Sequence, residues 1–123
     1  MLSFHKTVQV RSNLIEINDD DTRAVLIQRL PENNQFGVGT SLGGAVQAGM
    51  QVLTTSGPEH LRLTGGEILI LTDGIETVAP FVADVIDSVA ESGISVHAIS
   101  LGVDAIAGVE MISSETGTAY YSR

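Results

Sequence analysis

Short apolar runs alternate with amphipathic stretches along the second half of the chain. Residues 67–74 (EILILTDG) and 94–102 (ISVHAISLG) are continuous apolar runs that end in polar residues and glycine, a pattern typical of parallel strands buried on both faces. Residues 79–93 and 104–117 have the spacing and end signals of helices, and residues 118–122 (TAYYS) are strand-like. The alternation predicts a doubly wound, mostly parallel α/β sheet with helices on both faces and right-handed crossovers.

The first half of the chain is predicted to add a hairpin and two helices. Residues 7–17 (TVQVRSNLIEI) are rich in β-forming side chains and can pair with the preceding LSF. Residues 21–29 follow as a short helix, with Pro31 as its stop. Residues 41–55 place apolar side chains at spacings of four, four and three, which is one stripe of a longer helix: Leu42, Val46, Met50 and Leu53.

Two of these helices carry signals about how they pack. In residues 79–93, Val85 and Val89 face the core together with either Phe81 or Val82, and Gly93 ends the helix. In residues 41–55, a set of small residues allows the helix to lie close to a neighbour, at some cost in helix propensity: Gly43, Gly44, Ala45, Ala48 and Gly49.

Composition narrows the class of partner. The chain has 15 acidic and 6 basic residues and a formal net charge of −9, which disfavours nucleic acid and favours cations or basic protein surfaces. Its 123 residues, 43% of them apolar, suffice for one domain over residues 1–123. No apolar stretch approaches the roughly 18 residues that cross a bilayer, and the first ten residues lack the features of a signal peptide. We therefore expect no membrane insertion and no signal peptide in this chain.

The segment FGVGTSLGGA, residues 36–45, suggests an enzyme or an anion site. GTSLG matches the G-x-S-x-G pattern of a serine hydrolase, with Ser41 as the nucleophile and Asp73 and His97 in the matching chain order. However, no buried strand precedes Ser41, and His97 lies inside a predicted strand. A phosphate site lacks the lysine of a P-loop. The serine hydrolase therefore stays open only as an alternative.

Thr40 and Asp73 form a second candidate. Thr40 begins a predicted helix and Asp73 ends a predicted buried strand, so both are expected at the rim where ligands bind in such sheets. A hydroxyl and a carboxylate are oxygen donors of the kind that Mg²⁺ prefers, but they make up only half of a ligand set. Gly39 and Gly74 are placed to permit tight turns on either side.

Four stretches together resemble a known family. VGTSLGGAVQAGMQVL, GGEILILTDGIE, ESGISVHAISLG and MISSETGTAYY are similar to the von Willebrand factor type A domain, most closely to the version found in calcium-activated chloride channel regulator proteins. The resemblance covers nearly the whole chain. It implies a non-catalytic adhesion-type module, not an enzyme, in an extracellular or cell-surface setting and in a protein that takes part in channel regulation.

The resemblance also implies a metal-ion-dependent adhesion site. Thr40 and Asp73 match its threonine and its aspartate, with Gly39, Ser41 and Gly74 shaping the turns, and a protein partner offers an acidic residue to the metal. The D-x-S-x-S part of the pattern is absent, and the loop after Asp73 reads GIE, so that Glu76 is displaced by one position. The resemblance therefore implies at most a weak site for Mg²⁺ (or Mn²⁺ or Ca²⁺).

The chain resembles this domain from its second strand onward, so the central first strand is missing. Its loss is expected to leave two strand edges with unpaired N–H and C=O groups. Such edges favour pairing with another copy or with further parts of a longer protein. A metal-free, self-associating scaffold is therefore a further alternative, and residues 1–123 are interpreted as a partial domain.

Overall fold

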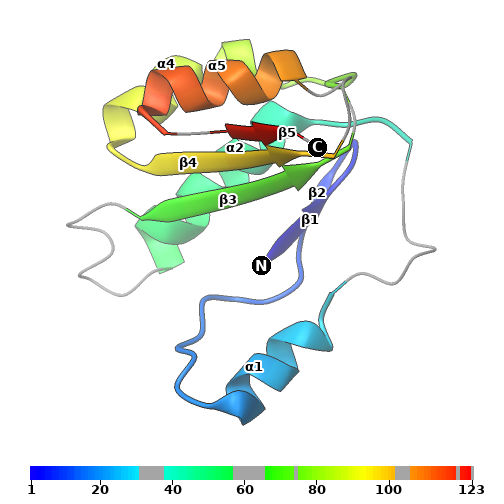
Figure 1. Ribbon diagram of the computed structural model, residues 1–123, viewed down its shortest axis with the longest axis vertical. Coiled ribbons are helices and arrows are strands. Elements are labelled where there is room, and N and C mark those ends of the chain that lie inside the picture. The colour runs from blue at the N-terminus through cyan, green and yellow to red at the C-terminus, as the bar shows by residue number, and fades with distance from the viewer. Residues whose placement is uncertain (31–37, 57–65, 74, 102–105, 119, 123) are drawn as a thin grey trace.

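Two separate sheets and a layer of helices form the fold (Figure 1). The computed structural model describes residues 1–30, 38–56, 66–73, 75–101, 106–118 and 120–122. The strands are β1 (Leu2–Phe4), β2 (Val8–Val10), β3 (Glu67–Thr72), β4 (Ser95–Ser100) and β5 (Tyr120–Ser122). The helices are α1 (Asp20–Ile27), α2 (Leu42–Gln51), α4 (Val82–Ser92) and α5 (Ile106–Thr116), and a π-helix, η1 (Val52–Ser56), continues α2.

The strand and helix predictions hold for most of the chain. β3, β4 and β5 form a parallel sheet in that order, with Ile70 opposite Ala98. β1 and β2 form the predicted antiparallel hairpin, with Ser3 opposite Gln9. Gly93 ends α4 in a left-handed conformation with φ 69°, which is accessible to a residue without a side chain. The predicted α/β class with a parallel sheet is confirmed.

One hydrophobic core joins α2, α4 and α5 to the sheet. The β3–α4–β4 and β4–α5–β5 connections step across the sheet in the same direction, so right-handed crossovers place both helices on one face. Val82 rather than Phe81 faces this core, since Val82 is 1% and Phe81 41% exposed. The core consists of buried aliphatic residues from α2, η1, β3, α4, β4 and α5 and from position 94, which directly precedes β4: Leu42, Val46, Leu53, Ile70, Val82, Val85, Val89, Ile94, Val96, Ala98, Val109 and Ile112.

The second face of the sheet differs from the prediction. Leu69 and Leu71 of β3 are 69% and 56% exposed, and their β4 partners His97 and Ile99 are half-buried on the same face. In the part of the chain that the structure describes, no helix covers this face. The expected two-sided helix layer is therefore seen on one side only, because α2, α4 and α5 all share the other.

The predicted strand over residues 7–17 is wrong beyond Val10. Arg11 and Ser12 both donate backbone hydrogen bonds to the Met1 carbonyl, at 3.0 and 3.2 Å. Since β1 begins at Leu2, these are the last hydrogen bonds at the open end of the hairpin. The following apolar side chains have no neighbouring strand in the described residues. Strand propensity alone does not form a strand without a partner to pair with.

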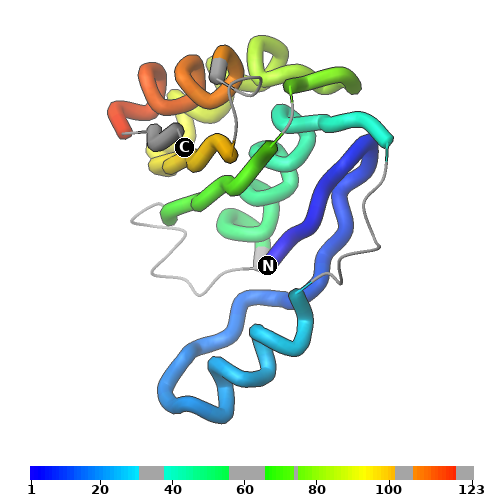
Figure 2. Tube along the Cα trace, turned by 45° about the vertical axis from the view of Figure 1, so that its right-hand side comes forward, coloured from blue at the N-terminus to red at the C-terminus, as the bar shows by residue number. Residues whose placement is uncertain are grey.

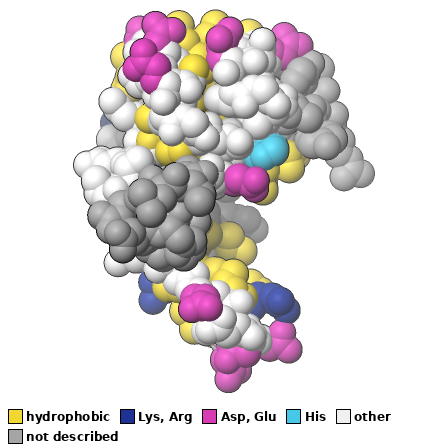
Figure 3. Space-filling model, turned by 90° about the vertical axis from the view of Figure 1, so that its left-hand side faces the viewer, with side chains coloured by type: hydrophobic (Ala, Val, Ile, Leu, Met, Phe, Trp, Pro, Cys, Tyr) yellow, Lys and Arg dark blue, Asp and Glu magenta, His cyan; other side chains and the backbone are white. Residues whose placement is uncertain are grey.

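Residues 12–30, which we call the arm, lead away from the rest of the molecule (Figures 1 and 2). α1 lies within the arm and has no buried residue. We call the rest of the described chain the body. Hydrophobic side chains are visible at the surface where the arm joins the body (Figure 3). The exposed apolar residues of the arm are Leu14, Ile15, Ile17, Val25, Ile27 and Leu30. Pro31, the predicted helix stop, lies outside the described residues.

Candidate functional site

The site proposed from sequence lies at one end of the molecule. Thr40 directly precedes the helix start at Ser41 and Leu42, and Asp73 directly follows β3. In Figures 1 and 2 the beginning of α2 and the carboxyl end of β3 lie at the same end of the fold. Asp73 is exposed and Thr40 is half-buried. Gly74 lies outside the described residues.

Backbone hydrogen bonds tie Thr40 to the segment that follows Asp73. The Thr40 carbonyl accepts from the backbone N–H groups of Thr77 and Val78, at 2.9 and 3.1 Å. In return the Thr40 N–H donates to the Thr77 hydroxyl at 2.9 Å. On the other side, the Ser41 N–H donates to the His5 carbonyl at 2.8 Å. Thr40 is thus held between the β1–β2 turn and residues 75–78.

Gly39 makes this junction possible. Its φ of +90° is a conformation that side chains disfavour. A Cβ at this position would lie 2.9 Å from Val78 Cγ2 and 3.3 Å from Thr77 Oγ1. The tight turn expected at Gly39 is therefore required both by its backbone angle and by the close approach of residues 77 and 78.

Glu76 joins the starts of two helices. Its Oε1 accepts a hydrogen bond from the Gly43 N–H at 2.9 Å and from the Val82 N–H at 2.8 Å, and its Oε2 accepts from Val82 at 3.0 Å. These N–H groups lie in the first turns of α2 and α4, where no intrahelical acceptor exists. Sequence reasoning noted the displacement of Glu76 but did not assign this role. No local pattern signals it, because Gly43 is 33 positions away.

The donor set fits only a weak, largely hydrated cation. A hydroxyl from Thr40 and a carboxylate from Asp73 are suitable hard oxygen donors, but Mg²⁺ takes about six. Both oxygens of Glu76 are already engaged by N–H groups. Among the described residues, no group of three or more acidic or histidine side chains lies close enough to hold a metal ion. When bound, a cation would supply an electrophilic contact for an acidic side chain of a partner.

The geometry around Ser41 does not favour the hydrolase alternative. Ser41 is only 3% exposed, and its hydroxyl donates a long hydrogen bond of 3.4 Å to the Pro80 carbonyl. Residues 38–40, the described residues directly before it, do not form a strand, whereas a nucleophile elbow places its serine at a strand-to-helix turn. His97 lies on the sheet face opposite to the one that packs on the helices.

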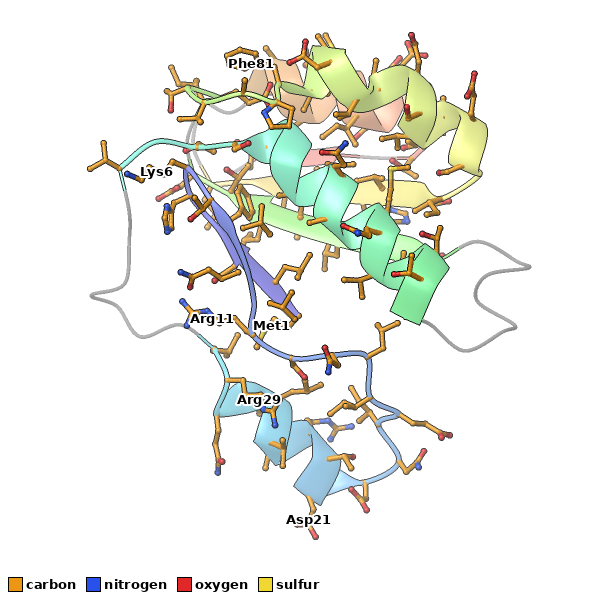
Figure 4. All side chains as sticks on the ribbon, turned by 180° about the vertical axis from the view of Figure 1, so that it is seen from behind. Met1, Lys6, Arg11, Asp21, Arg29 and Phe81 are labelled. Carbon is orange, nitrogen blue, oxygen red and sulfur yellow. The ribbon has the colours of Figure 1, made fainter. Side chains whose placement is uncertain are left out.

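Exposed apolar side chains lie in the same chain segments as the candidate donors, Thr40 and Asp73. We define the rim as residues 38–41, 73, 75–81 and 101, which lie at the carboxyl ends of β3 and β4 and at the starts of α2 and α4. Figure 4 shows Phe81 and Lys6 at the end where α2 begins. The exposed apolar side chains of the rim are Val38 (91%), Ile75 (54%), Leu101 (48%) and Phe81 (41%).

Within the described residues, no helix is both long and apolar enough to cross a membrane.

Comparison with known proteins identifies the family. The chain is 36% identical over 121 residues to calcium-activated chloride channel regulator 4 of Homo sapiens, and 32% identical over 117 residues to calcium-activated chloride channel regulator 1 of Bos taurus. These matches cover 98% and 95% of this chain but 12% of each relative.

Two further matches concern the domain itself. A solved structure described as an uncharacterized membrane spanning protein from Vibrio fischeri matches 99% of this chain and 66% of that chain, at 15% identity and a TM-score of 0.41; the family assignment does not rest on it. The family profile of the von Willebrand factor type A domain matches residues 1–123. The chain therefore belongs to the von Willebrand factor type A domain family.

Proposed function

We propose that this chain is a non-catalytic protein-interaction module that binds its partner at the rim. The observation that carries the proposal is that four large apolar side chains in the rim segments that contain Thr40 and Asp73 are exposed. Large apolar side chains gathered at one place on a surface mark interaction sites more often than scattered ones do. The surrounding backbone is held by long-range hydrogen bonds, which favours a preformed binding surface.

A weak divalent cation is part of this proposal. Thr40 would supply a direct oxygen to Mg²⁺, Mn²⁺ or Ca²⁺, and Asp73 a direct or water-mediated one. The partner would then contribute an acidic side chain. Two protein donors correspond to a dissociation constant in the roughly millimolar range or weaker, where sites with few charged ligands fall.

Calorimetric titration with Mg²⁺ and Mn²⁺ tests the cation. We expect weak binding to the wild type and none to a Thr40→Ala/Asp73→Ala variant. Asp87→Asn in α4 is the control, because Asp87 is exposed and lies outside the rim. Binding that survives in the double variant would overturn the assignment of Thr40 and Asp73.

The two separate sheets favour a second candidate, a metal-free scaffold that self-associates. β1 and β3 belong to different sheets, so each has an edge without a strand partner in the described residues. Unpaired edges are templates for pairing with another chain. In this alternative, strand pairing between copies and not the rim is the function.

Sedimentation over a range of protein concentrations, with and without chelator, distinguishes the two candidates. Self-association should grow with concentration, ignore the chelator and weaken in Leu69→Lys. This substitution places a charge on β3, which has no strand partner on one edge within the described residues. Leu101→Lys is the matched control, because Leu101 lies beyond the end of β4. A concentration-independent monomer would dispose of the scaffold.

The similarity to calcium-activated chloride channel regulators supports a proposed setting. We place the chain outside the cell or at its surface, in a protein that takes part in channel regulation. Surface labelling of cells that express the protein containing this chain tests the location, and exclusive recovery of that protein from the cytosol would contradict it.

A further inference from the structure

We propose that Glu76 is the positioning residue of the rim, a carboxylate bridge that fixes residues 75–81, and with them Asp73, relative to Thr40. This inference rests on the proposed function of the rim. It adds a residue that is not itself a cation ligand, together with a test that needs no cation.

The bridge satisfies two helix starts with one side chain. Glu76 accepts from Gly43 in α2 and from Val82 in α4, and Glu76 is only half-buried. Backbone N–H groups at helix starts carry partial positive charge, so one carboxylate stabilises both ends. Hydrogen bonds from N–H groups to a charged carboxylate are stronger than those to neutral acceptors.

Close packing of α2 against α4 brings the N–H groups of Gly43 and Val82 within reach of Glu76. A Cβ on Gly43 would lie 2.4 Å from both the carbonyl carbon and the carbonyl oxygen of Phe81. Only glycine at position 43 therefore allows the start of α2 to touch the start of α4. The predicted role of small residues in close packing is thus located at this contact.

The Glu76 bridge lies close in the chain to Asp73 and is linked by hydrogen bonds to Thr40, the two candidate cation ligands. Glu76 is three residues after Asp73 and directly precedes Thr77, whose N–H and hydroxyl hold the backbone of Thr40. Movement of Glu76 would therefore displace Thr77 and, through its hydrogen bonds, the backbone of Thr40. Residues that orient metal ligands in this way typically change metal affinity by about 10- to 100-fold when mutated.

Amide spectra of the cation-free protein test the bridge directly. In Glu76→Ala, the amide protons of Gly43 and Val82 should both shift, and their hydrogen exchange should accelerate about tenfold or more. Formate supplies a free carboxylate and should partly restore both signals. The control is Glu91→Gln, at an exposed position on α4. It removes one negative charge, as Glu76→Ala does, and should alter neither amide signal.

Two outcomes would overturn the bridge. One is unchanged Gly43 and Val82 amides in Glu76→Ala. The other is an equal change in Glu91→Gln. If Glu76→Ala does not fold, Glu76→Gln replaces it: a single amide oxygen can accept from both N–H groups, so intermediate exchange at Gly43 and Val82 is expected, and wild-type exchange would contradict the bridge.

The cation experiment is read separately. Mn²⁺ affinity should fall about tenfold or more in Glu76→Gln relative to Glu91→Gln, and equal affinity in the two variants would contradict a positioning role. If the wild type binds no Mn²⁺, the proposed cation site fails, while the amide spectra still decide whether Glu76 fixes the rim.

Discussion

The starts of α1 and of the α2–α4 pair differ in how they satisfy their free N–H groups: α1 uses a local side chain alone, whereas the pair shares Glu76 in addition to a local hydrogen bond from the Phe81 N–H to Asp84 at 2.8 Å. At α1, the Asp19 side chain accepts from the Thr22 N–H, three residues on, at 2.9 Å, and the groups involved are exposed. At α2 and α4, Glu76 accepts from residues that lie 33 and 6 positions away. The α1 cap can form in an isolated segment, whereas the Glu76 bridge exists only when the body is folded.

The two regions also differ in what they bury. α2 contributes Leu42 and Val46 to the core, at 1% and 0% exposure, while α1 buries nothing. Most helix stability in proteins comes from packing one face and little from propensity. The arm should therefore fray before the body unfolds, and the rim should share the stability of the core.

The largest expected effect separates the core from the arm. Leu42→Ala should lower the free energy of unfolding by about 2–5 kcal/mol, because it removes a fully buried side chain and leaves a cavity. Ile27→Ala, at 59% exposure in α1, should change it by less than about 0.5 kcal/mol. Denaturant titration of both variants measures the difference, and comparable losses would show that α1 packs on the body.

A smaller effect is expected where α2 meets α4. Gly43→Ala should destabilise by about 1–3 kcal/mol through overpacking, because its new Cβ would meet the Phe81 backbone. In Gly44→Ala the nearest atom is the Ser41 hydroxyl at 2.6 Å, a side-chain atom that can rotate away, so the loss should be smaller. Thermal unfolding compares the two, and a reversed order would contradict close packing at Gly43.

The smallest expected effect is confined to the arm and depends on pH. The backbone hydrogen bond from Thr22 lowers the pKa of Asp19 below its ordinary value, so the cap stabilises α1 when the carboxyl is ionised. That stabilisation is complete above the unfolded pKa and is lost as pH falls through the lowered, folded value.

Carbon chemical shifts of residues 20–27 report this transition. They should move toward coil values as acid protonates Asp19, while the signals of α2 should stay helical over the same pH range. Asp19→Ala should show the acid-like shifts already at neutral pH. Full helicity of α1 in Asp19→Ala would show that Asp19 does not stabilise the helix start.

The sequence predicted those elements whose signals are local. β3, β4 and α4 lie within three residues of their predicted bounds, because apolar runs, helical spacing and Gly93 mark them directly. The strand over residues 7–17 was wrong beyond Val10, because a strand depends on a partner that composition does not reveal. The side of the sheet on which the helices pack likewise depends on the order of the strands, which only the fold shows.

The rim was predictable only in part. Thr40 and Asp73 follow from their positions at a helix start and a strand end, and their role as cation donors stays a prediction. The role of Glu76 had no sequence signal, because three hydrogen bonds to Gly43 and Val82 depend on the approach of α2 to α4. Ser41, the serine of the G-x-S-x-G pattern, is instead a buried residue at the start of α2.

Line broadening by Mn²⁺ in amide spectra tests the central claim most directly, because the arm offers a competing acidic cluster, Asp19–Asp21. Low Mn²⁺ should broaden the signals of Thr40, Asp73 and Ile75 first, and Thr40→Ala/Asp73→Ala should abolish this effect. Broadening confined to the arm, or unchanged at the rim in the double variant, would contradict a cation-assisted interaction site at the rim.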